Sequence, residues 1–432
     1  MAHPGCRILH VAEGRRRDEM AFSRFLRNPG VSPAALSAGA AARTAARVEG
    51  RDVLAIQDAS AIILGGKKVR MQGFGPAGKG GAPGGVFLHA VLAVDAASGD
   101  LPGLADAALW NRTGGRRVVE TRRRGRAERE SQRWPAGAAR AGEVLSQARR
   151  IAVACDREGD IFEDFARRPA NVHLPARSLH DRAIGTDPGG GKLLLSKHIS
   201  GLPEVARYTV AVPAAPGRAA RVATVALRHG PASAEAPADI VARERKSLPA
   251  HVASHVADAV EIDAPAGVAP LHWRLPATHP VADAAAAREI VRLHRLRWIV
   301  EAYFRTLKTA GFRIGEAEAM MNFAAMAAIA AVAVTRLVRA RDNPGGRSLP
   351  DAFGDDDIPV LEAVAASHEG SKPAKRQTNP HPRRTMACAT WVVARLGGWT
   401  GTYGKPGPKT LDRGMERYKA IKQGFDLKEG IV

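Results

Sequence analysis

The chain has 432 residues, of which 45% are hydrophobic, enough for two or three domains with a sizeable buried core. It has no uninterrupted apolar run of about eighteen residues, and its start lacks the pattern of a secretory signal. The sequence therefore predicts a cytoplasmic protein without a membrane partner. A formal net charge of +21, from 64 Lys and Arg against 43 Asp and Glu, favours a polyanionic partner, because neutralised phosphates release condensed counterions. A coding bias toward Arg and Ala would produce the same excess, so the charge alone is weak evidence.

The cysteines exclude two kinds of site. Cys6, Cys155 and Cys388 are too few and too far apart in the chain for a disulfide framework or a zinc site. Cys155 lies inside an apolar run and is interpreted as a small core residue.

Residues 1–50 are predicted to hold two short helices, one from Glu19 to Arg27 and one that ends near Arg47. The residues between them, 28–30, have the sequence Asn-Pro-Gly, which is typical of a turn.

Two apolar runs end at aspartates. The run at residues 53–56 leads to Asp58, and the run at 151–155 leads to Asp156, as buried strands would. The order up to this point is strand, strand, strand, helix, strand. This is the layout of an RNase H-like core, in which the two aspartate-bearing strands lie side by side and their carboxylates can share metal ions. The intervening elements are strands at 86–94 and 101–110, a basic segment at 112–133 and a helix that ends near residue 150.

The predicted fold class is α/β, with an RNase H-like catalytic core, an inserted β-rich subdomain and an α-helical C-terminal domain. The alternation and the Pro and Gly breaks after residue 207 favour the inserted sheet. The predicted segments are a shortened N-terminal DNA-binding helical segment at 1–50, the first part of the core at 51–180, the β subdomain at 181–276, the second part of the core at 277–341, a loop or linker at 342–385 and a helical C-terminal region at 386–432.

Residues 284–310 are predicted to form an amphipathic helix. At about 100° per residue, His294, Arg297, Glu301 and Lys308 fall within about 60° of one another, beside an apolar stripe. A carboxylate among three basic groups could complete a metal site while the cations hold phosphates. A solvated face with ion pairs such as Arg297 to Glu301 is the alternative, and it is favoured for this helix taken alone. The apolar stripe consists of Leu293, Leu296, Val300, Phe304 and Leu307.

Three stretches together resemble a known family, the insertion-sequence transposases of the IS-four family. The helix is similar to the family's Tyr-x2-Arg-x3-Glu-x6-Lys motif, with His294 in place of Tyr. Residues 57–60, Gln-Asp-Ala-Ser, resemble the segment that carries the family's first Asp. Residues 155–160, Cys-Asp-Arg-Glu-Gly-Asp, resemble the segment that carries the second. Within this last segment Glu158 and Asp160 are expected to make local hydrogen bonds.

Weaker similarities follow in the same order along the chain. Residues 22–29 resemble a DNA-contacting element of the family and include Arg24 and Arg27. Arg177 stands where the family has an Arg that contacts the DNA end. Trp273 stands where it has a Trp that stacks on a flipped base, although Trp273 would equally suit the core of a strand. Residues 130–134 and 393–399 also match.

The resemblance implies a DDE transposase that carries out cut-and-paste transposition by DNA cleavage, hairpin formation and strand transfer. Asp58, Asp156 and Glu301 would be catalytic and would hold two Mg²⁺ ions, for which Mn²⁺ can substitute. Oxygen ligands without a His or Cys cluster also favour these ions. The partners would be double-stranded DNA, namely terminal inverted repeats and target DNA, and a second copy of the chain in the DNA complex. The DNA-binding residues would be Arg24, Arg27, Arg177, Trp273, His294, Arg297 and Lys308.

Two alternatives remain open. The first is a metal-dependent nuclease on the same core, without strand transfer. The second is a catalytically impaired DNA-binding remnant, because the family segment before the Arg-Asn-Pro element has no evident counterpart here. Bound to DNA, any of these proteins would be associated with the nucleoid.

Overall fold

The chain divides into two compact units, which we describe separately. The first unit contains Met1–Arg47, Ala59–Glu120 and Ile299–Val432, and the second contains Val48–Asp58 and Thr121–Trp298. The computed structural model describes residues 15–63, 73–77, 84–112, 130–186, 188–214, 218–237, 247–308, 316–342, 345, 349, 352–369, 377–402 and 404–429. Most of the basic segment predicted at 112–133 lies outside these residues.

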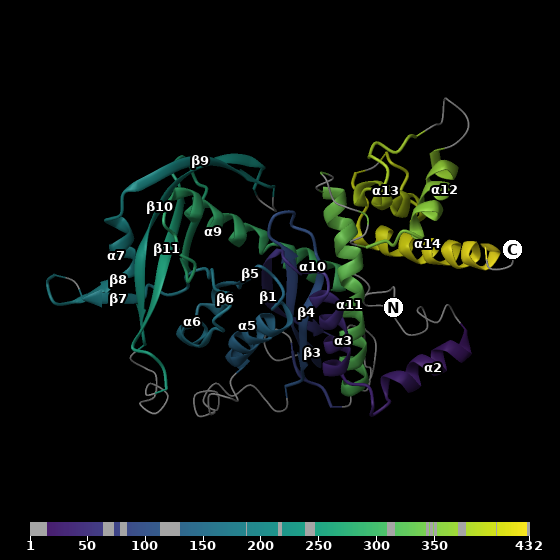
Figure 1. The fold of residues 1–432 in the computed structure, drawn as a ribbon, viewed down its shortest axis with the longest axis horizontal. Coiled ribbons are helices and arrows are strands. Elements are labelled where there is room, and N and C mark those ends of the chain that lie inside the picture. Colours follow the sequence, from purple (N-terminus) through teal and green to yellow (C-terminus); the bar gives the residue numbers. More distant parts are fainter. Residues whose placement is uncertain are drawn as a thin grey trace. The chain divides into compact units, whose positions relative to one another are not determined.

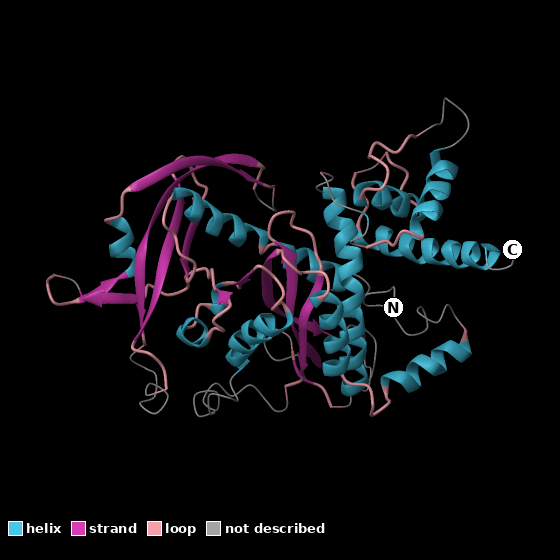
Figure 2. Cartoon of the chain, viewed as in Figure 1, coloured by secondary structure: helices cyan, strands magenta, loops and turns pink. Residues whose placement is uncertain are grey.

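Helices dominate the first unit, and strands dominate the second (Figures 1 and 2). The elements of the first unit are α2 (Arg16–Leu26), α3 (Pro33–Ala45), β2 (Gly75–Pro76), β3 (Gly84–Asp95), β4 (Gly103–Trp110), α10 (Ile299–Lys308), α11 (Ala317–Asp342), α12 (Asp357–Glu369), α13 (Met386–Leu396) and α14 (Pro408–Glu429). Those of the second unit are η3 (Glu130–Gln132), α5 (Arg133–Val144), β5 (Arg150–Ala154), η4 (Arg157–Gly159), α6 (Phe162–Arg167), β6 (Val172–His173), β7 (Ala183–Thr186), β8 (Lys192–Leu194), α7 (Leu195–Ser200), β9 (Glu204–Val212), β10 (Arg221–Glu235), β11 (His251–Glu261), β12 (His272–Ala277) and α9 (Ala284–Leu296). Strand β1 (Asp52–Ile63) contributes to both units.

The fold is mixed α/β. Its largest sheet has the strand order β2-β3-β1-β5-β6, with β4 paired to β3. Strands β1 and β5 are parallel neighbours, with Asp52 opposite Arg150 and Ile56 opposite Ala154. The apolar residues at 53–56 of β1 and 151–154 of β5 are buried, as expected for strands in the interior of a sheet. The prediction that these two strands lie side by side is confirmed.

A four-stranded antiparallel sheet, β12-β11-β10-β9, forms the β-rich part of the second unit. Helix α9 packs on it through Ile290 and Val291, which share a core with Leu227 and Leu275. Helix α7 forms a smaller cluster with the sheet at Val256. The strands β7 to β12 span residues 183–277 and so confirm the predicted β-rich character of residues 181–276.

Helix α11 is the central helix of the first unit. It is long and apolar enough to cross a membrane by length and composition, but 72% of its apolar window is buried inside the protein. It contacts α3, α10, α13 and β4, which is the environment of a core helix.

The prediction of a loop or linker over 342–385 is wrong for part of this range, because α12 occupies Asp357–Glu369. The residues Val360, Leu361 and Val364 of α12 are buried in a core shared with α13 and α14. Packing on this core therefore stabilises a helix that the polar and Gly-rich surroundings did not predict.

The helix predicted at 284–310 is also corrected, because it is interrupted at Arg297 and Trp298, between α9 and α10. Helix α9 is capped at its start by Asp283, whose carboxylate accepts the backbone N–H of Ala286 at 2.8 Å. Its buried face belongs to the core of the second unit, whereas α10 buries its apolar residues in the first. The four polar residues predicted to lie along one helix therefore belong to two helices, His294 to α9 and Glu301 and Lys308 to α10, with Arg297 at the end of α9.

Candidate functional site

Asp58 lies within β1, and Asp156 lies just beyond the end of its parallel neighbour β5. Each lies two residues beyond a pair, Ile56 and Ala154, that the register of β1 and β5 places opposite one another. Neighbouring strands are about 4.8 Å apart. Both aspartates are partly buried. The prediction that each strand stops at its aspartate holds for Asp156 but is wrong for Asp58, because β1 continues beyond Asp58 to Ile63.

The turn after β5 orients Asp156. Its Oδ1 accepts the backbone N–H of Glu158 at 2.8 Å and so caps the short helix η4. A side chain at Gly159 would collide with the sulfur and Cβ of Cys155, so the turn can approach the strand end this closely only with glycine. Burial raises the pKa of the Cys155 thiol well above its usual range, which confirms Cys155 as an inert core residue.

Basic side chains surround Asp156 within the second unit. Arg177 is half-buried, and its pKa is lowered first by burial and then by the positive charges of Arg157 and Arg297, while Asp156 acts in the opposite direction. Arg297 is only 6% exposed, and its Nε has no hydrogen-bond partner among the residues that the structure describes. A cluster of guanidinium groups this close together favours a bound anion such as phosphate.

His294 is buried within range of the charges of Arg297 and Arg177. Its ring is 2% exposed, and burial together with the charges of Arg297 and Arg177 lowers its pKa to about 3, so the ring is neutral at physiological pH. Its Nδ1 has no hydrogen-bond partner in the described part of the chain. A buried neutral ring is better placed to support Arg297 than to contact DNA, so the predicted DNA contact of His294 stays a prediction.

Trp273 lies in β12 opposite Ala259 of β11. It is partly buried and packs against the core that α9 and the sheet share. The ring is therefore a structural part of the sheet, and its predicted role in base stacking stays a prediction.

Glu301 and Lys308 lie on α10, in the first unit. They are seven residues apart, which places them on one face of the helix. The Nζ of Lys308 donates to Ser60 Oγ at 2.5 Å. Ser60 is the second residue after Asp58 in β1, so both project from the same face of this strand. Lys308 thus contacts β1 through Ser60, and Glu301 itself is exposed.

The donor set suits a hard cation only in part. Asp58 and Asp156 offer carboxylate oxygens, which Mg²⁺ and Mn²⁺ prefer. Within the described ranges, however, no group of three or more His, Cys, Asp and Glu side chains is arranged to hold a metal ion. Glu301 as third ligand therefore stays a prediction.

Arg24 and Arg27 are exposed at the end of α2 and just after it. Arg27 Nε bonds to Glu316 at 2.8 Å, and this carboxylate raises the pKa of Arg27. An exposed ion pair of this kind contributes about 0–1 kcal/mol and is easily exchanged for a phosphate.

Sequence reasoning assigned no role to Ser60 or to Arg182, which forms a buried ion pair with Asp160 at 2.7 Å. Ser60 could have been found from its two-residue spacing to Asp58. Glu158 and Asp160 do make hydrogen bonds, but their side-chain partners are distant in the chain, because Asp160 bonds to Leu179 and Glu158 bonds to Arg133 at 2.8 Å. Comparison of the chain with models of known protein families gives no match.

Proposed function

We propose that the protein is a DDE-type DNA transposase with an RNase H-like core, acting in the cytoplasm at the nucleoid. The observation that carries the proposal is the placement of Asp58 and Asp156 two residues beyond the paired Ile56 and Ala154 of the parallel neighbours β1 and β5. The basic cluster of Arg177 and Arg297 beside Asp156 supports a phosphate-containing substrate. The motif resemblance of the same residues specifies transposition among the reactions that such a site could perform.

In this proposal Asp58, Asp156 and Glu301 hold the metal ions. When bound, Mg²⁺ would supply an activated water and neutralise the leaving oxyanion. Arg177 and Arg297 hold phosphate oxygens next to the scissile bond, and neutral His294 supports Arg297. Lys308, which bonds Ser60 in the free protein, exchanges this hydroxyl for a phosphate. Trp273 receives a base when the strand bends into a hairpin. Paired DNA ends are held by two copies of the chain.

The test is incubation with Mg²⁺ and linear duplex DNA that carries the sequences flanking the gene. Hairpinned or joined products are expected. Simple nicks alone would favour a metal-dependent nuclease. DNA binding without any cleavage would favour the catalytically impaired remnant.

Glu301→Gln should lower the cleavage rate by more than about a hundredfold, because it removes a metal ligand. DNA affinity measured without Mg²⁺ should stay nearly unchanged, because no phosphate contact is lost. Glu318→Gln is a matched control, since Glu318 is also exposed and also lies in the first turn of a helix of the first unit. Cleavage by Glu301→Gln at the rate of the control would remove Glu301 from the site.

A further inference from the structure

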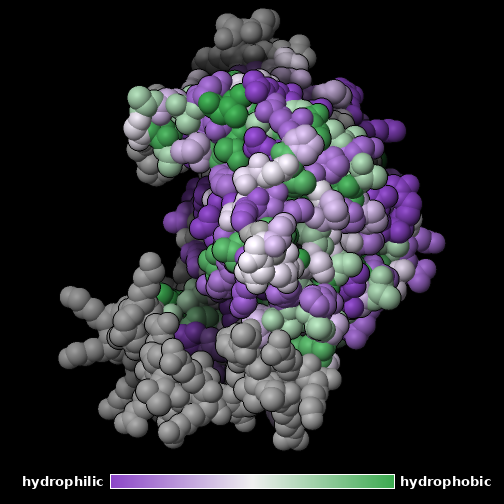
Figure 3. Space-filling view, turned by 90° about the vertical axis from the view of Figure 1, so that its left-hand side faces the viewer, coloured by the Kyte–Doolittle hydropathy of each residue, from purple (hydrophilic) through white to green (hydrophobic). Residues whose placement is uncertain are grey.

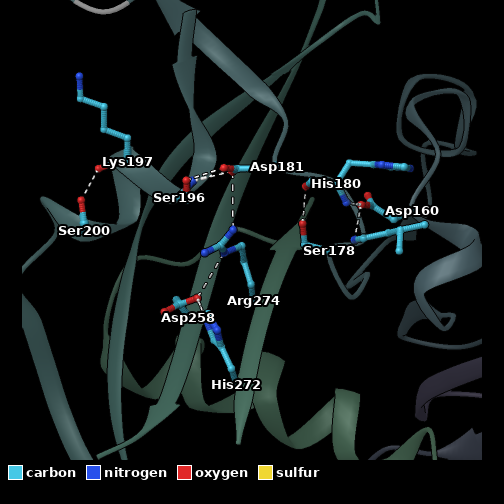
Figure 4. A network of polar contacts seen from close by, with 11 residues as sticks. Asp160, Ser178, His180, Asp181, Ser196, Lys197, Ser200, Asp258, His272 and Arg274 are labelled. Atoms are coloured by element: carbon cyan, nitrogen blue, oxygen red, sulfur yellow. Dashed lines mark hydrogen bonds and ion pairs between the residues drawn. The ribbon is translucent and has the colours of Figure 1, made fainter. Parts of the chain in front are cut away.

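The loop at residues 177–182 precedes β7 and lies between Asp160 and the four-stranded sheet, as the contacts of Ser178, His180 and Asp181 show (Figure 4). Its start is hydrogen-bonded to β12, because the N–H of Ala176 donates to Pro276 O at 3.0 Å and that of Ser178 to Arg274 O at 2.9 Å. Arg177 lies between these two bonds. How firmly Arg177 is held beside Asp156 depends also on the contacts that fix residues 178–182.

Asp160 binds this loop at three residues. Its Oδ2 accepts the backbone N–H of Leu179 at 2.7 Å and that of His180 at 3.3 Å. Its Oδ1 accepts Nε of Arg182 at 3.0 Å and Nη2 at 2.7 Å. The Asp160 side chain is 0% exposed and that of Arg182 is 9% exposed. Both carboxylate oxygens are therefore saturated by the loop and shielded from water.

Asp160 is also tied directly to Asp156. The helical turn η4 joins them, with the N–H of Gly159 donating to Asp156 O and the N–H of Asp160 donating to Arg157 O, both at 3.2 Å. Movement of the loop would therefore break bonds to the same turn that Asp156 caps.

The far end of the loop is fastened to other elements. Asp181 accepts the backbone N–H of Ser196, in α7, at 2.8 Å, and lies 3.6 Å from Arg274 of β12 (Figure 4). Arg274 in turn lies 3.7 Å from Asp258 of β11. The sheet thus holds the loop from one side and Asp160 holds it from the other.

Holding is needed because Arg177 lies next to like charges. After burial, the like charges of Arg157 and Arg297 lower the pKa of Arg177, so movement of the loop away from them would relieve repulsion. A buried, fully bonded carboxylate opposes such movement, since its hydrogen bonds are charge-assisted.

We infer that Asp160 is a positioning residue, which fixes the loop 177–182 so that Arg177 stays beside Asp156 and holds a DNA phosphate there. The inference rests on the proposed function, because it assigns Asp160 a role in that same site. Asp160 itself touches neither the DNA nor a metal ion. It acts through Arg177.

Two readouts without metal ions test the inference. In Asp160→Asn, the amides of Leu179 and His180 should exchange with solvent at least about tenfold faster, because their charged acceptor is lost. DNA binding is measured with EDTA as a function of salt. Arg177→Ala should make the negative slope of log affinity against log salt less steep by about 0.9, the value for one phosphate contact. Asp160→Asn should give a similar reduction, and the double variant should lose no more than Arg177→Ala.

Glu261→Gln is the matched control. Glu261 is a buried carboxylate of the same unit, with a side chain that is 1% exposed. It likewise accepts two guanidinium bonds, from Arg221, and one backbone N–H, from Leu271. This variant should leave both the salt slope and the exchange of Leu179 and His180 unchanged. If Asp160→Asn does not fold, Arg182→Lys replaces it, because it keeps the charge and loses the two-point contact.

The outcomes separate the two proposals. A reduced slope in Arg177→Ala with an unchanged slope in Asp160→Asn would overturn the role of Asp160 and leave the proposed function standing. Additive losses in the double variant would also overturn it, because Asp160 would then act independently of Arg177. If the wild type binds no DNA, the proposed function fails and the positioning role fails with it. Faster exchange at Leu179 and His180 in Asp160→Asn would in that case still show that Asp160 fixes the loop 177–182.

Discussion

At the scale of single residues, burial sets the charge states around the candidate site. The basic side chain of Arg297 and the ring of His294 are both buried, and the ring is neutral. Asp164 of α6 is a third buried ionisable group, and its Oδ1 has no hydrogen-bond partner among the described residues. Burial, and then the charge of Glu163, raises the pKa of the Asp164 carboxyl to about 7.

This pKa predicts how stability depends on pH. The unfolded chain releases the proton near pH 3.9 and the folded chain only near 7, so between these values the folded state binds more protons. The contribution of Asp164 to the free energy of unfolding therefore falls as the pH rises from about 4 to 7. Asp164→Asn cannot ionise and should gain stability over the wild type with rising pH, by up to about 4 kcal/mol above pH 7.

Urea denaturation at about pH 5 and pH 8 measures this difference. The variant Glu163→Gln, one position away and only partly buried, should show a much smaller change. If the free energy of unfolding depends on pH in the same way for the wild type and Asp164→Asn, the Asp164 carboxyl is already ionised in the folded protein at about pH 5.

At the scale of elements, α11 fastens the turn that carries Arg27. The buried side chain of Asn322 donates from Nδ2 to Leu26 O at 2.9 Å and to Val31 O at 3.1 Å. The turn is also closed internally, because the N–H of Gly30 donates to Asn28 Oδ1 at 2.8 Å. The Arg-Asn-Pro segment is thus presented from a rigid support.

Asn322→Leu should lower the free energy of unfolding by about 1–3 kcal/mol, because two carbonyls lose their donor. Thr335→Val is the control on the same helix. Thr335 is equally buried, but its hydroxyl donates only to Ala331 O within α11, so its loss should cost less than about 1 kcal/mol. Urea denaturation compares the two, and equal losses would show that the turn does not depend on Asn322.

At the scale of the whole molecule, charge is the dominant feature. The formal net charge is +21, and the side of the second unit seen in Figure 3 is mainly hydrophilic, with exposed apolar residues in small groups. Such a surface favours association with DNA that depends strongly on salt.

Five of the proposed DNA contacts are Arg or Lys, which predicts a slope of log affinity against log salt of about −4 to −5. Affinity for a duplex should accordingly fall several hundredfold between about 50 and 200 mM salt. Arg24→Gln should make the slope less steep by about 0.9. Arg413 is an exposed residue of α14 without a proposed DNA contact, so Arg413→Gln should leave the slope unchanged. Fluorescence anisotropy with labelled DNA measures both. A slope no steeper than about −1 would contradict a surface that contacts several phosphates.

The sequence by itself determined the apolar cores of the strands β1 and β5, their pairing, and the aspartate that follows β5, whereas the continuation of β1 past Asp58 to Ile63 was not predicted. An apolar run of strand length that stops at a carboxylate requires only local information, and the order of the elements was enough to make the two strands neighbours. The amphipathic helices and the β-rich segment were predictable for the same reason.

Tertiary structure decided the rest. The helical pattern continues through Arg297 and Trp298, yet the helix breaks there, because its two halves pack on different cores. Burial of His294 depends on the same packing. The contacts of Asp160 with residues 179–182 join positions about twenty residues apart, and no local pattern encodes such contacts. Periodicity reports which face of an element is apolar, whereas the elements that cover this face are set by the packing of the whole chain.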